Sequence, residues 1–546
     1  MPGKSLSIVG VACALVLATV AQAETSTQAA LEHLVGQLRV DGHLEIGASQ
    51  VAAVELIPEV YERRDYIPAW VSDASVDAVF EAIRNSYEHG LDPEDYHWHA
   101  INELRSRVAA GAGAEEAAEM EILLTDAVVR LAYHASFGKV LPGELDPNWN
   151  FDRRLHSPDP VAELGGVLGT TDLTSAIRER SNAPIFYDRL CEALARYRDI
   201  AAEGGWPSIA SGPTLKLGMM SERIAPLRLR LQRTGDLADK QTDDPEVFDA
   251  ALKRAVIAFQ NRYGLAPDGA AGPATLATLN VPVEQRIDQI RVNLERIRWV
   301  YKELPEDYVI VDIAGFHVYL VQTNEFVWQA RAQVGKPYRN TPVFRDSIRY
   351  LEFNPTWTVP QTILREDILP RLEHGPSYLD KRNMQILDRN GKPVDVSTID
   401  WPSVSGGNFP YILRQNPGPD NALGRVKFMF PNKHAVYIHD TPSKSLFARN
   451  ERMFSSGCIR VERPFELAEL LLDDPERWDR QGIQQVLDSR RTQRVNLKEP
   501  LPVLILYWTA EADAEGRVHF RNDVYDRDEP VLDALEGEFR FVVPDA

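Results

Sequence analysis

The sequence predicts a multidomain α+β protein, with an N-terminal helical scaffold domain, a small three-helix module and a mainly-β domain that carries a capping insertion. Three observations lead to this prediction. The chain has 546 residues, of which 44% are hydrophobic, so it can bury several separate cores. Apolar residues recur with a helical period over roughly the first 300 residues. From about residue 305 the period shortens to two, which is typical of β-strands.

The charge balance and the cysteine count exclude several classes of function. Against 60 Lys and Arg stand 80 Asp and Glu, which gives a formal net charge of −20. A field of this sign repels phosphate backbones, so we do not expect nucleic acid as a partner. Only Cys13, Cys191 and Cys458 occur, which is too few for a disulfide-rich scaffold or a cysteine-rich zinc fold. We expect neither a metal nor an organic cofactor.

Residues 1–23 have the pattern of an export signal peptide. Lys4 supplies the positive start, residues 6–21 are almost entirely apolar, and Ala21-Gln22-Ala23 is a cleavage site of the small-x-small type. We therefore expect the mature chain to work outside the cytoplasm. The alternative is a retained segment that anchors the protein in the inner membrane, although a spanning helix needs about 20 apolar residues. In an oxidising compartment Cys191 and Cys458 form either a disulfide or two separate thiols.

The scaffold domain is expected over residues 24–215, where apolar residues repeat with the helical period. In the segment 186–197, Cys191 falls on the apolar stripe, where we expect it to fill a gap in the core. The pair His97-x-His99 could indicate a metal site. Because no further ligands cluster nearby in the sequence, we expect this pair in a solvated loop.

A compact unit follows over residues 216–283, and a connecting helix over 284–304. Two amphipathic helices, at 220–233 and 246–263, precede the turn Gly-Leu-Ala-Pro-Asp-Gly at 264–269, and Gly272-Pro273 starts a short third helix. The stretch AVIAFQNRYGLAPDGAAGPATLATLN resembles the peptidoglycan-binding-like three-helix module. The resemblance implies either that this unit binds glycan or that it only braces its neighbours.

The β domain is expected over residues 305–510, and a hairpin with a tail over 511–546. Alternating apolar residues predict strands near 309–313, 318–321, 326–332, 356–359 and 435–439. A polar stretch rich in Pro and Gly, at about 365–430, interrupts them and is too long for an ordinary connection. An insertion of this kind beside a site acts as a lid or substrate cap, and the alternative is a structural excursion without a gating role.

Two segments of the β domain carry candidate chemistry. In the strand predicted over 434–439, Ala435, Tyr437 and His439 share one face, while the residues between them enter the core. Cys458 lies in the sequence Ser-Ser-Gly-Cys-Ile-Arg-Val at 455–461, near a glycine-containing turn. A cysteine nucleophile needs a base within hydrogen-bond reach, and His439 is the candidate.

The rest of the candidate machinery surrounds this pair. The imidazole of His439 must be oriented through its other nitrogen, and Asp440 offers the nearest carbonyl or carboxylate. Backbone N–H groups at Gly457 and Cys458 could stabilise a tetrahedral oxyanion. Taken alone, a cysteine and a histidine so far apart in the chain are a weak signal, since most cysteines are inert core residues.

The interval of 15 residues from His439 to Ser455-Ser456-Gly457-Cys458-Ile459-Arg460 resembles the signature of the L,D-transpeptidases. In their YkuD-type catalytic domain, a histidine precedes a [Ser/Thr]-His-Gly-Cys-hydrophobic-Asn block by about that distance. The stretches NPTWTVPQTI and HDTPSKSLFARNERMFSSGC further resemble the large Gram-negative branch, which has scaffold and peptidoglycan-binding-like domains. Two residues depart from the general motif: Ser456 replaces a histidine and Arg460 an asparagine.

The resemblance implies roles for the residues of this sequence. Cys458 is the nucleophile, His439 the base and Asp440 the neighbour that orients the base through its carbonyl, while Ser456, Gly457 and Cys458 form the oxyanion turn. Four further residues are candidates for substrate contact. They are Tyr437, Arg460, Ser455 and Trp357, with His434 as a weaker one. For Tyr437, Trp357 and His434 the alternative is a packing or strand-edge role, and for Arg460 it is a structural ion pair.

The family implies a periplasmic enzyme that acts on peptidoglycan stem peptides. Cys458 would attack a tetrapeptide donor stem, release D-Ala and form a thioester, which an amine of a second stem resolves to give a 3–3 cross-link. Carbapenem-type inhibitors would form the same thioester, and other cell-wall synthesis enzymes are expected partners. One alternative is an L,D-carboxypeptidase or endopeptidase of the same fold, and another is a non-catalytic peptidoglycan-binding scaffold.

Overall fold

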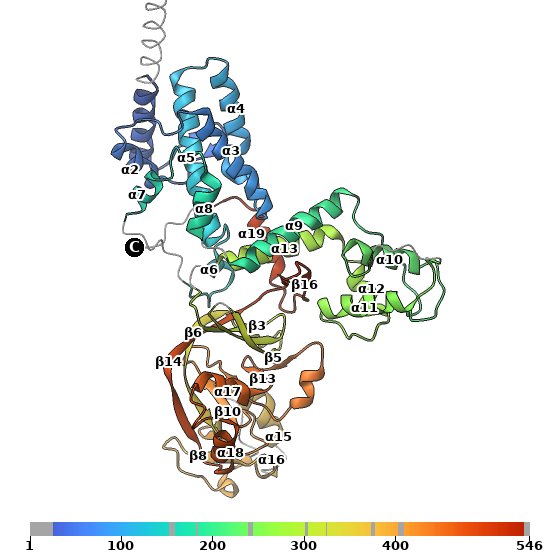
Figure 1. The fold of residues 1–546 in the computed structure, drawn as a ribbon. Helices are drawn as coiled ribbons and strands as arrows, with labels where there is room; N and C mark the ends of the chain where they lie inside the picture. Colours follow the sequence, from blue (N-terminus) through green and yellow to red (C-terminus); the bar gives the residue numbers. More distant parts are fainter. Residues whose placement is uncertain are drawn as a thin grey trace, which may run out of the picture.

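The computed structural model describes residues 26–151, 159–181, 184–238, 244–300, 304–323, 325–372, 377–401, 404 and 409–539. The expected export signal, the end of the expected C-terminal tail and parts of the expected insertion therefore lie outside the described residues. Figure 1 shows a helical region at the top of the view, a small helical module at the right and a β domain at the bottom. Within the described part of the chain, no helix combines the length and the apolar character needed to cross a bilayer.

The helical region is built around one long buried helix, α5. Ile122, Leu124 and Val128 of this helix are fully buried, because neighbouring helices cover it on several sides. Residues 26–41 are also helical. The remaining elements are β1 (Glu45–Ile46), β2 (Ser49–Gln50), α2 (Leu56–Arg63), α3 (Asp73–Glu88), η1 (Pro93–Tyr96), α4 (Trp98–Ala109), α5 (Ala114–Phe137), α6 (Pro142–Leu145), α7 (Pro160–Gly165), α8 (Leu173–Ser181) and α9 (Ile185–Ala202).

The expectation of a solvated His97 is wrong. The ring of His97 is 5% exposed, and its Nε2 lies 2.8 Å from Oδ2 of Asp126, a fully buried carboxylate. Asp126 also accepts a hydrogen bond of 2.7 Å from Nε of Arg130. A buried charge needs such partners, so His97 completes a polar network inside the helical region. The sequence did not reveal this network because His97 lies 29 residues before its partner Asp126.

The small module contains three helices, α10 (Ile224–Arg233), α11 (Ala250–Arg262) and α12 (Pro273–Leu279). Gly269 in the turn between α11 and α12 has a φ of +72°, and a Cβ there would lie 2.8 Å from Cγ of Lys253. This turn therefore requires glycine. The next helix, α13 (Val283–Arg298), packs along α9 and leads the chain to the β domain (Figure 1).

The β domain contains a nine-stranded mixed sheet in the described part of the chain, in the order β12-β5-β13-β11-β10-β6-β14-β3-β4. β5 also pairs with β4, so the sheet closes on itself. Its core holds fully buried side chains such as Val309, Phe353 and Ile459. The strands are β3 (Tyr308–Asp312), β4 (His317–Gln322), β5 (Glu325–Gly335), β6 (Phe344–Phe353), β10 (Val426–Met429), β11 (Ile438–His439), β12 (Met453–Ser455), β13 (Ile459–Val461) and β14 (Gln493–Leu506). Two helices pack on it, α17 (Pro464–Leu472) and α18 (Arg480–Asp488).

The insertion folds as a unit with its own core. A three-stranded sheet in the order β7-β9-β8 packs with short helices around Leu364, Leu372 and Leu413. Its elements are β7 (Trp357–Thr358), α14 (Gln361–Ile363), η3 (Leu364–Ile368), α15 (Leu369–Leu372), α16 (Ser377–Lys381), β8 (Met384–Leu387), η4 (Val396–Thr398) and β9 (Ile412–Gln415). The expected fold class is confirmed: a helical N-terminal region, a three-helix module and a mainly-β domain.

The C-terminal segment returns to the helical region. After the hairpin of β15 (Ala510–Ala512) and β16 (Val518–Phe520), helix α19 (Asp528–Glu536) packs against α13. Nζ of Lys139 donates a hydrogen bond of 2.7 Å to the carbonyl oxygen of Leu535. The β domain is thereby tied to the helices at both of its ends.

Candidate active site

Two short parallel strands bring His439 and Cys458 to the same face of the sheet. β11 and β13 pair in the register Ile438 with Ile459 and His439 with Arg460. Ile438 and Ile459 are fully buried in the core. Because side chains alternate, His439 and Arg460 point to the opposite face, and so do Tyr437 and Cys458, one repeat earlier.

The strand predicted over 434–439 is shorter in the structure, where only Ile438–His439 are paired. Ala435 has a φ of +53°, which breaks the strand. The side chain of Asn432 takes over backbone hydrogen bonds here: its Nδ2 donates to the carbonyl oxygen of Val436 at 2.7 Å, and its Oδ1 accepts from His434 N at 2.9 Å. Asparagine commonly competes with a sheet ladder in this way. The segment before β11 is therefore a turn that bends toward Cys458.

Cys458 is a free, half-buried thiol. Its Sγ lies 3.7 Å from the carbonyl oxygen of Ala435, and Tyr437 also hydrogen-bonds to it. Burial raises the pKa of this thiol, while the hydrogen bonds from Tyr437 and the charges of Lys427 and Arg460 act in the opposite direction. Among the described residues, the hydrogen-bonding contacts of the sulfur are with Ala435 and Tyr437 and do not include His439.

Cys191 is also free, so the two described cysteines are separate thiols. Its sulfur lies on α9, 3.5 Å from Nδ1 of His89, and burial raises its pKa to about 12. A thiol with such a pKa stays protonated and unreactive near neutral pH.

His439 is held as a neutral base. Its ring is 3% exposed, and Nδ1 lies 2.5 Å from the carbonyl oxygen of Asp440. Since a carbonyl only accepts, Nδ1 carries the proton and the lone pair is on Nε2. Burial, and then the charge of Arg460, lowers the pKa of His439 to about 3. The carboxylate of Asp440 points elsewhere, to the backbone N–H of Arg425 at 2.9 Å and to Lys444.

The turn before Cys458 is built by Ser455. The hydroxyl of Ser455 accepts a hydrogen bond of 3.1 Å from Gly457 N and donates one of 2.5 Å to the carbonyl oxygen of Cys458. Thr341 Oγ1 donates to the carbonyl oxygen of Gly457 at 2.9 Å. The Gly457 N–H is therefore engaged within the turn, whereas the Cys458 N–H has no hydrogen-bond partner in the part of the chain that the structure describes. Ser455 is 2% exposed, which places it inside the turn and away from an open cleft.

Ser456 is exposed and links the turn to the insertion. Its Oγ accepts a hydrogen bond of 2.9 Å from Nη1 of Arg339. The same guanidinium pairs with Glu366 at 2.5 Å and with Asp367 at 2.6 Å, both in η3 of the insertion. Arg339 therefore connects Ser456, two positions before the nucleophile candidate, to the insertion. Sequence reasoning missed it because the contact spans 117 residues.

A polar row crosses this face of the sheet. Glu352 on β6 pairs with Lys427 on β10, Lys427 with His439, His439 with Arg460, and Arg460 with Gln333 on β5. Directly opposed residues lie on the same face, so Lys427 flanks His439.

Lys427 and Arg460 are the cations of this row. Nζ of Lys427 lies 4.1 Å from the centre of the Tyr437 ring, and burial lowers the pKa of Lys427. Arg460 donates from Nη1 to Oε1 of Gln333 at 3.2 Å, and burial lowers its pKa too. The Nε of Arg460 is buried and has no hydrogen-bond partner among the described residues. The sequence held one signal for Lys427: it stands between two core positions, Val426 and Phe428, of a buried strand.

The two remaining candidates pack against apolar side chains. Trp357 is on β7, pairs with Gln415 and packs against the core of the insertion. His434 packs on Phe344, with 4.7 Å between the ring centres. Within the described residues, no group of three or more His, Cys, Asp or Glu side chains is placed to hold a metal ion.

Three segments of the chain match known domain families. Residues 55–194 match a "Scaffold domain", residues 221–279 a "Putative peptidoglycan binding domain" and residues 306–486 an "L,D-transpeptidase catalytic domain". Domains that act on peptidoglycan indicate an extracytoplasmic location.

The chain also matches known proteins. The chain is 34% identical over 251 residues to a protein of Haemophilus influenzae described as "Putative L,D-transpeptidase". The match covers 45% of this chain and 50% of that protein. The chain therefore spans about half the length of this relative. Two solved structures match with low TM-scores. An L,D-transpeptidase from Xylanimonas cellulosilytica has 15% identity, a TM-score of 0.18 and coverage of 54% of this chain and 98% of that one. A fused Zn-dependent amidase/peptidase with a peptidoglycan-binding domain, from Clostridium acetobutylicum, has 12% identity, a TM-score of 0.15 and coverage of 54% and 100%.

The sheet that carries Cys458 and His439 lies within the third matched segment. Residues 306–486 thus match the L,D-transpeptidase catalytic domain (YkuD), and in this chain they follow segments that match a scaffold domain and a peptidoglycan-binding domain.

Proposed function

We propose that this protein is a peptidoglycan L,D-transpeptidase in which Cys458 is the nucleophile and His439 the general base. The observation that carries the proposal is the pairing of β11 with β13, which sets a half-buried thiol and a neutral imidazole on one face of a sheet. The match of this segment to the catalytic-domain family supports it.

In the first half of the proposed reaction, the thiol loses its proton as it attacks. Because burial raises the pKa of Cys458, the thiol is protonated at rest, and His439 Nε2 accepts the proton. Attack requires the Cys458 side chain to turn from Ala435 toward His439. The sulfur bonds to the carbonyl carbon of the third residue of a donor tetrapeptide. The Cys458 N–H, which no partner occupies among the described residues, stabilises the oxyanion.

Collapse of the tetrahedral intermediate breaks the bond to the terminal D-Ala. His439 gives its proton to the leaving amine, and a thioester remains on Cys458. In the second half, His439 takes a proton from the amine of a second stem, that amine attacks the thioester, and the thiol recovers a proton from His439. The product is a 3–3 cross-link. With water as acceptor, the same cycle shortens the stem.

Lys427 and Arg460 provide positive charge beside the reacting thiol. Both are half-buried and lie in the same polar row as His439. Stem peptides carry carboxylates, and a cation with reduced solvation attracts a carboxylate more strongly than an exposed one. We assign both residues to substrate contact. Peptidoglycan is therefore the substrate and an extracytoplasmic compartment the place of action.

The test uses isolated cell walls. Walls are incubated with wild type, Cys458→Ala or Cys191→Ala, digested, and their muropeptides identified by mass spectrometry. We expect 3–3 linked dimers with wild type and Cys191→Ala and none with Cys458→Ala. Shortened or uncoupled stems without dimers would instead assign carboxypeptidase or endopeptidase activity. Identical products from all three proteins would favour a non-catalytic binding protein.

A further inference from the structure

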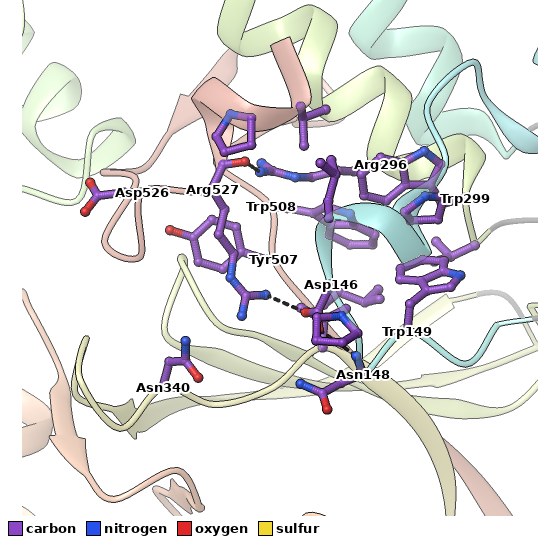
Figure 2. A pocket seen from close by; sticks show the side chains of 18 residues that line it. Asp146, Asn148, Trp149, Arg296, Trp299, Asn340, Tyr507, Trp508, Asp526 and Arg527 are labelled. Atoms are coloured by element: carbon purple, nitrogen blue, oxygen red, sulfur yellow. Dashed lines mark hydrogen bonds and ion pairs between the residues drawn. The ribbon is translucent and has the colours of Figure 1, made fainter. Parts of the chain in front are cut away.

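A cavity that does not include Cys458 in its lining lies where the helical region meets the β domain. Its volume is about 430 Å³, within the range of about 300–1,000 Å³ that is usual for small-molecule sites. The cavity is bordered by the residues after α6, by the end of α13, by the end of β14 and by the residues around α19 (Figure 2).

Three tryptophans gather on one side of this cavity. Figure 2 shows Trp149 and Trp299 at the right of the view and Trp508 nearer its centre, and each of them is partly exposed. The rings of Trp149 and Trp299 meet edge to face, with 5.5 Å between their centres. The indole N–H of Trp149 has no hydrogen-bond partner in the described part of the chain. The indole N–H of Trp299 donates to Oε1 of Glu295 at 2.9 Å, so these rings offer a ligand their flat apolar faces.

The other side of the cavity is polar, but its charges are largely paired. Arg527 Nη1 lies 3.3 Å from Oδ2 of Asp146, and Arg296 Nη1 lies 2.5 Å from Oδ1 of Asp528. Asn340 and Asp526 are exposed. An anionic ligand would meet two arginines that are already neutralised and an exposed carboxylate. The lining therefore suits an uncharged ligand that has one apolar face and carries many hydroxyl or amide groups.

The cavity adjoins the turn that holds Cys458. Asn340 lines the cavity, and its carbonyl oxygen lies 3.4 Å from the place where a Cβ on Gly457 would stand. The next residue, Thr341, donates to the Gly457 carbonyl at 2.9 Å. A stem peptide is attached to a sugar, and three residues of extended chain span only about 10 Å. A sugar that delivers the third residue of its stem to Cys458 must therefore lie close to this turn.

From these observations we infer that the cavity binds an uncharged N-acetylated amino sugar of the glycan strand that carries the donor stem. The apolar face of the sugar ring would lie on the tryptophan side, and its hydroxyl and amide groups would meet Asn340, Asp146 and Arg527. The inference rests on the proposed function for the identity of the polymer. It assigns glycan recognition to the junction between the domains, separate from the three-helix module.

The test is a binding titration of the full-length protein with a soluble trimer of N-acetylglucosamine, followed by calorimetry. We expect wild type to bind, Trp149→Ala and Asn340→Ala to bind about tenfold more weakly or not at all, and Trp98→Ala to bind like wild type. Trp98 is the matched control because it also is partly exposed but packs on Phe80 in the helical region. Exposed Asn340 provides a second variant should Trp149→Ala fail to fold.

Two results would overturn the inference. One is the absence of trimer binding by wild type. The other is equal binding by wild type, Trp149→Ala and Asn340→Ala. Equal binding would place the glycan on another surface, such as the three-helix module. The variant Cys458→Ala separates this inference from the proposed function, because we expect it to bind the trimer like wild type while forming no cross-links.

Discussion

Replacement of Ser455 by alanine tests whether the turn before Cys458 depends on one buried hydroxyl. The hydroxyl satisfies the Gly457 N–H and the Cys458 carbonyl, and the side chain is 2% exposed. Its loss leaves one buried donor and one buried acceptor without a partner. At about 1–2 kcal/mol for each group, Ser455→Ala should lower the free energy of unfolding by about 2–4 kcal/mol.

The same loss loosens the position of the thiol, so we expect the rate of acylation by a carbapenem to fall at least about tenfold, since 1.4 kcal/mol corresponds to a factor of ten. The adjacent Ser456→Ala is the matched control. Ser456 is exposed and loses one hydrogen bond to Arg339, which keeps Glu366 and Asp367, so the cost should stay below about 1 kcal/mol. The assays are urea unfolding and mass spectrometry of the acylated protein over time. Equal effects of the two substitutions, or no effect of Ser455→Ala, would refute the reasoning.

Three further predictions follow from the polar contacts around the site. Lys427→Met removes a charge that lowers the pKa of Cys458, so the pH profile of Cys458 alkylation should move to higher pH. The control Lys427→Arg keeps the charge and should leave the profile in place. An unchanged profile in Lys427→Met would contradict the prediction. Arg339→Ala cuts the contact between Ser456 and η3, so amide exchange over 361–372 should become faster than in Arg331→Ala, whose partner Glu462 lies outside the insertion. His439 has a pKa of about 3 in the folded protein, below its ordinary value near 6.5. Between these two values the unfolded state binds the extra proton, so the free energy of unfolding should fall as the pH is lowered from 6.5 toward 3. This part of the pH dependence should be missing in His439→Gln, and identical curves of stability against pH for the two proteins would contradict the prediction.

Much of the fold could be predicted because it depends on local patterns. The change of period near residue 305 marks the start of the β domain, and the amphipathic pattern at 246–263 corresponds to α11, Ala250–Arg262. The residues alone gave only a weak indication that His439 pairs with the segment of Cys458, and the family resemblance strengthened it. Periodicity alone does not say which two strands become neighbours.

What the sequence did not reveal depends on contacts between distant residues. Asn432 shortens the predicted strand by capturing backbone groups, and Arg339 reaches Ser456 across 117 residues. The Gly457 N–H was expected to face an oxyanion, but Ser455 occupies it in the structure. Each of these results from competition for a hydrogen bond, and the outcome depends on which polar group lies closest in three dimensions.

The central claim is that Cys458, with His439 as its base, is the group that becomes acylated. Full-length protein is incubated with a carbapenem, digested with trypsin, and the modified peptide is located by mass spectrometry. We expect one adduct, on the peptide that contains Cys458, formed at least about 100-fold more slowly in His439→Gln. An adduct on Cys191, no adduct at all, or an unchanged rate in His439→Gln would contradict it.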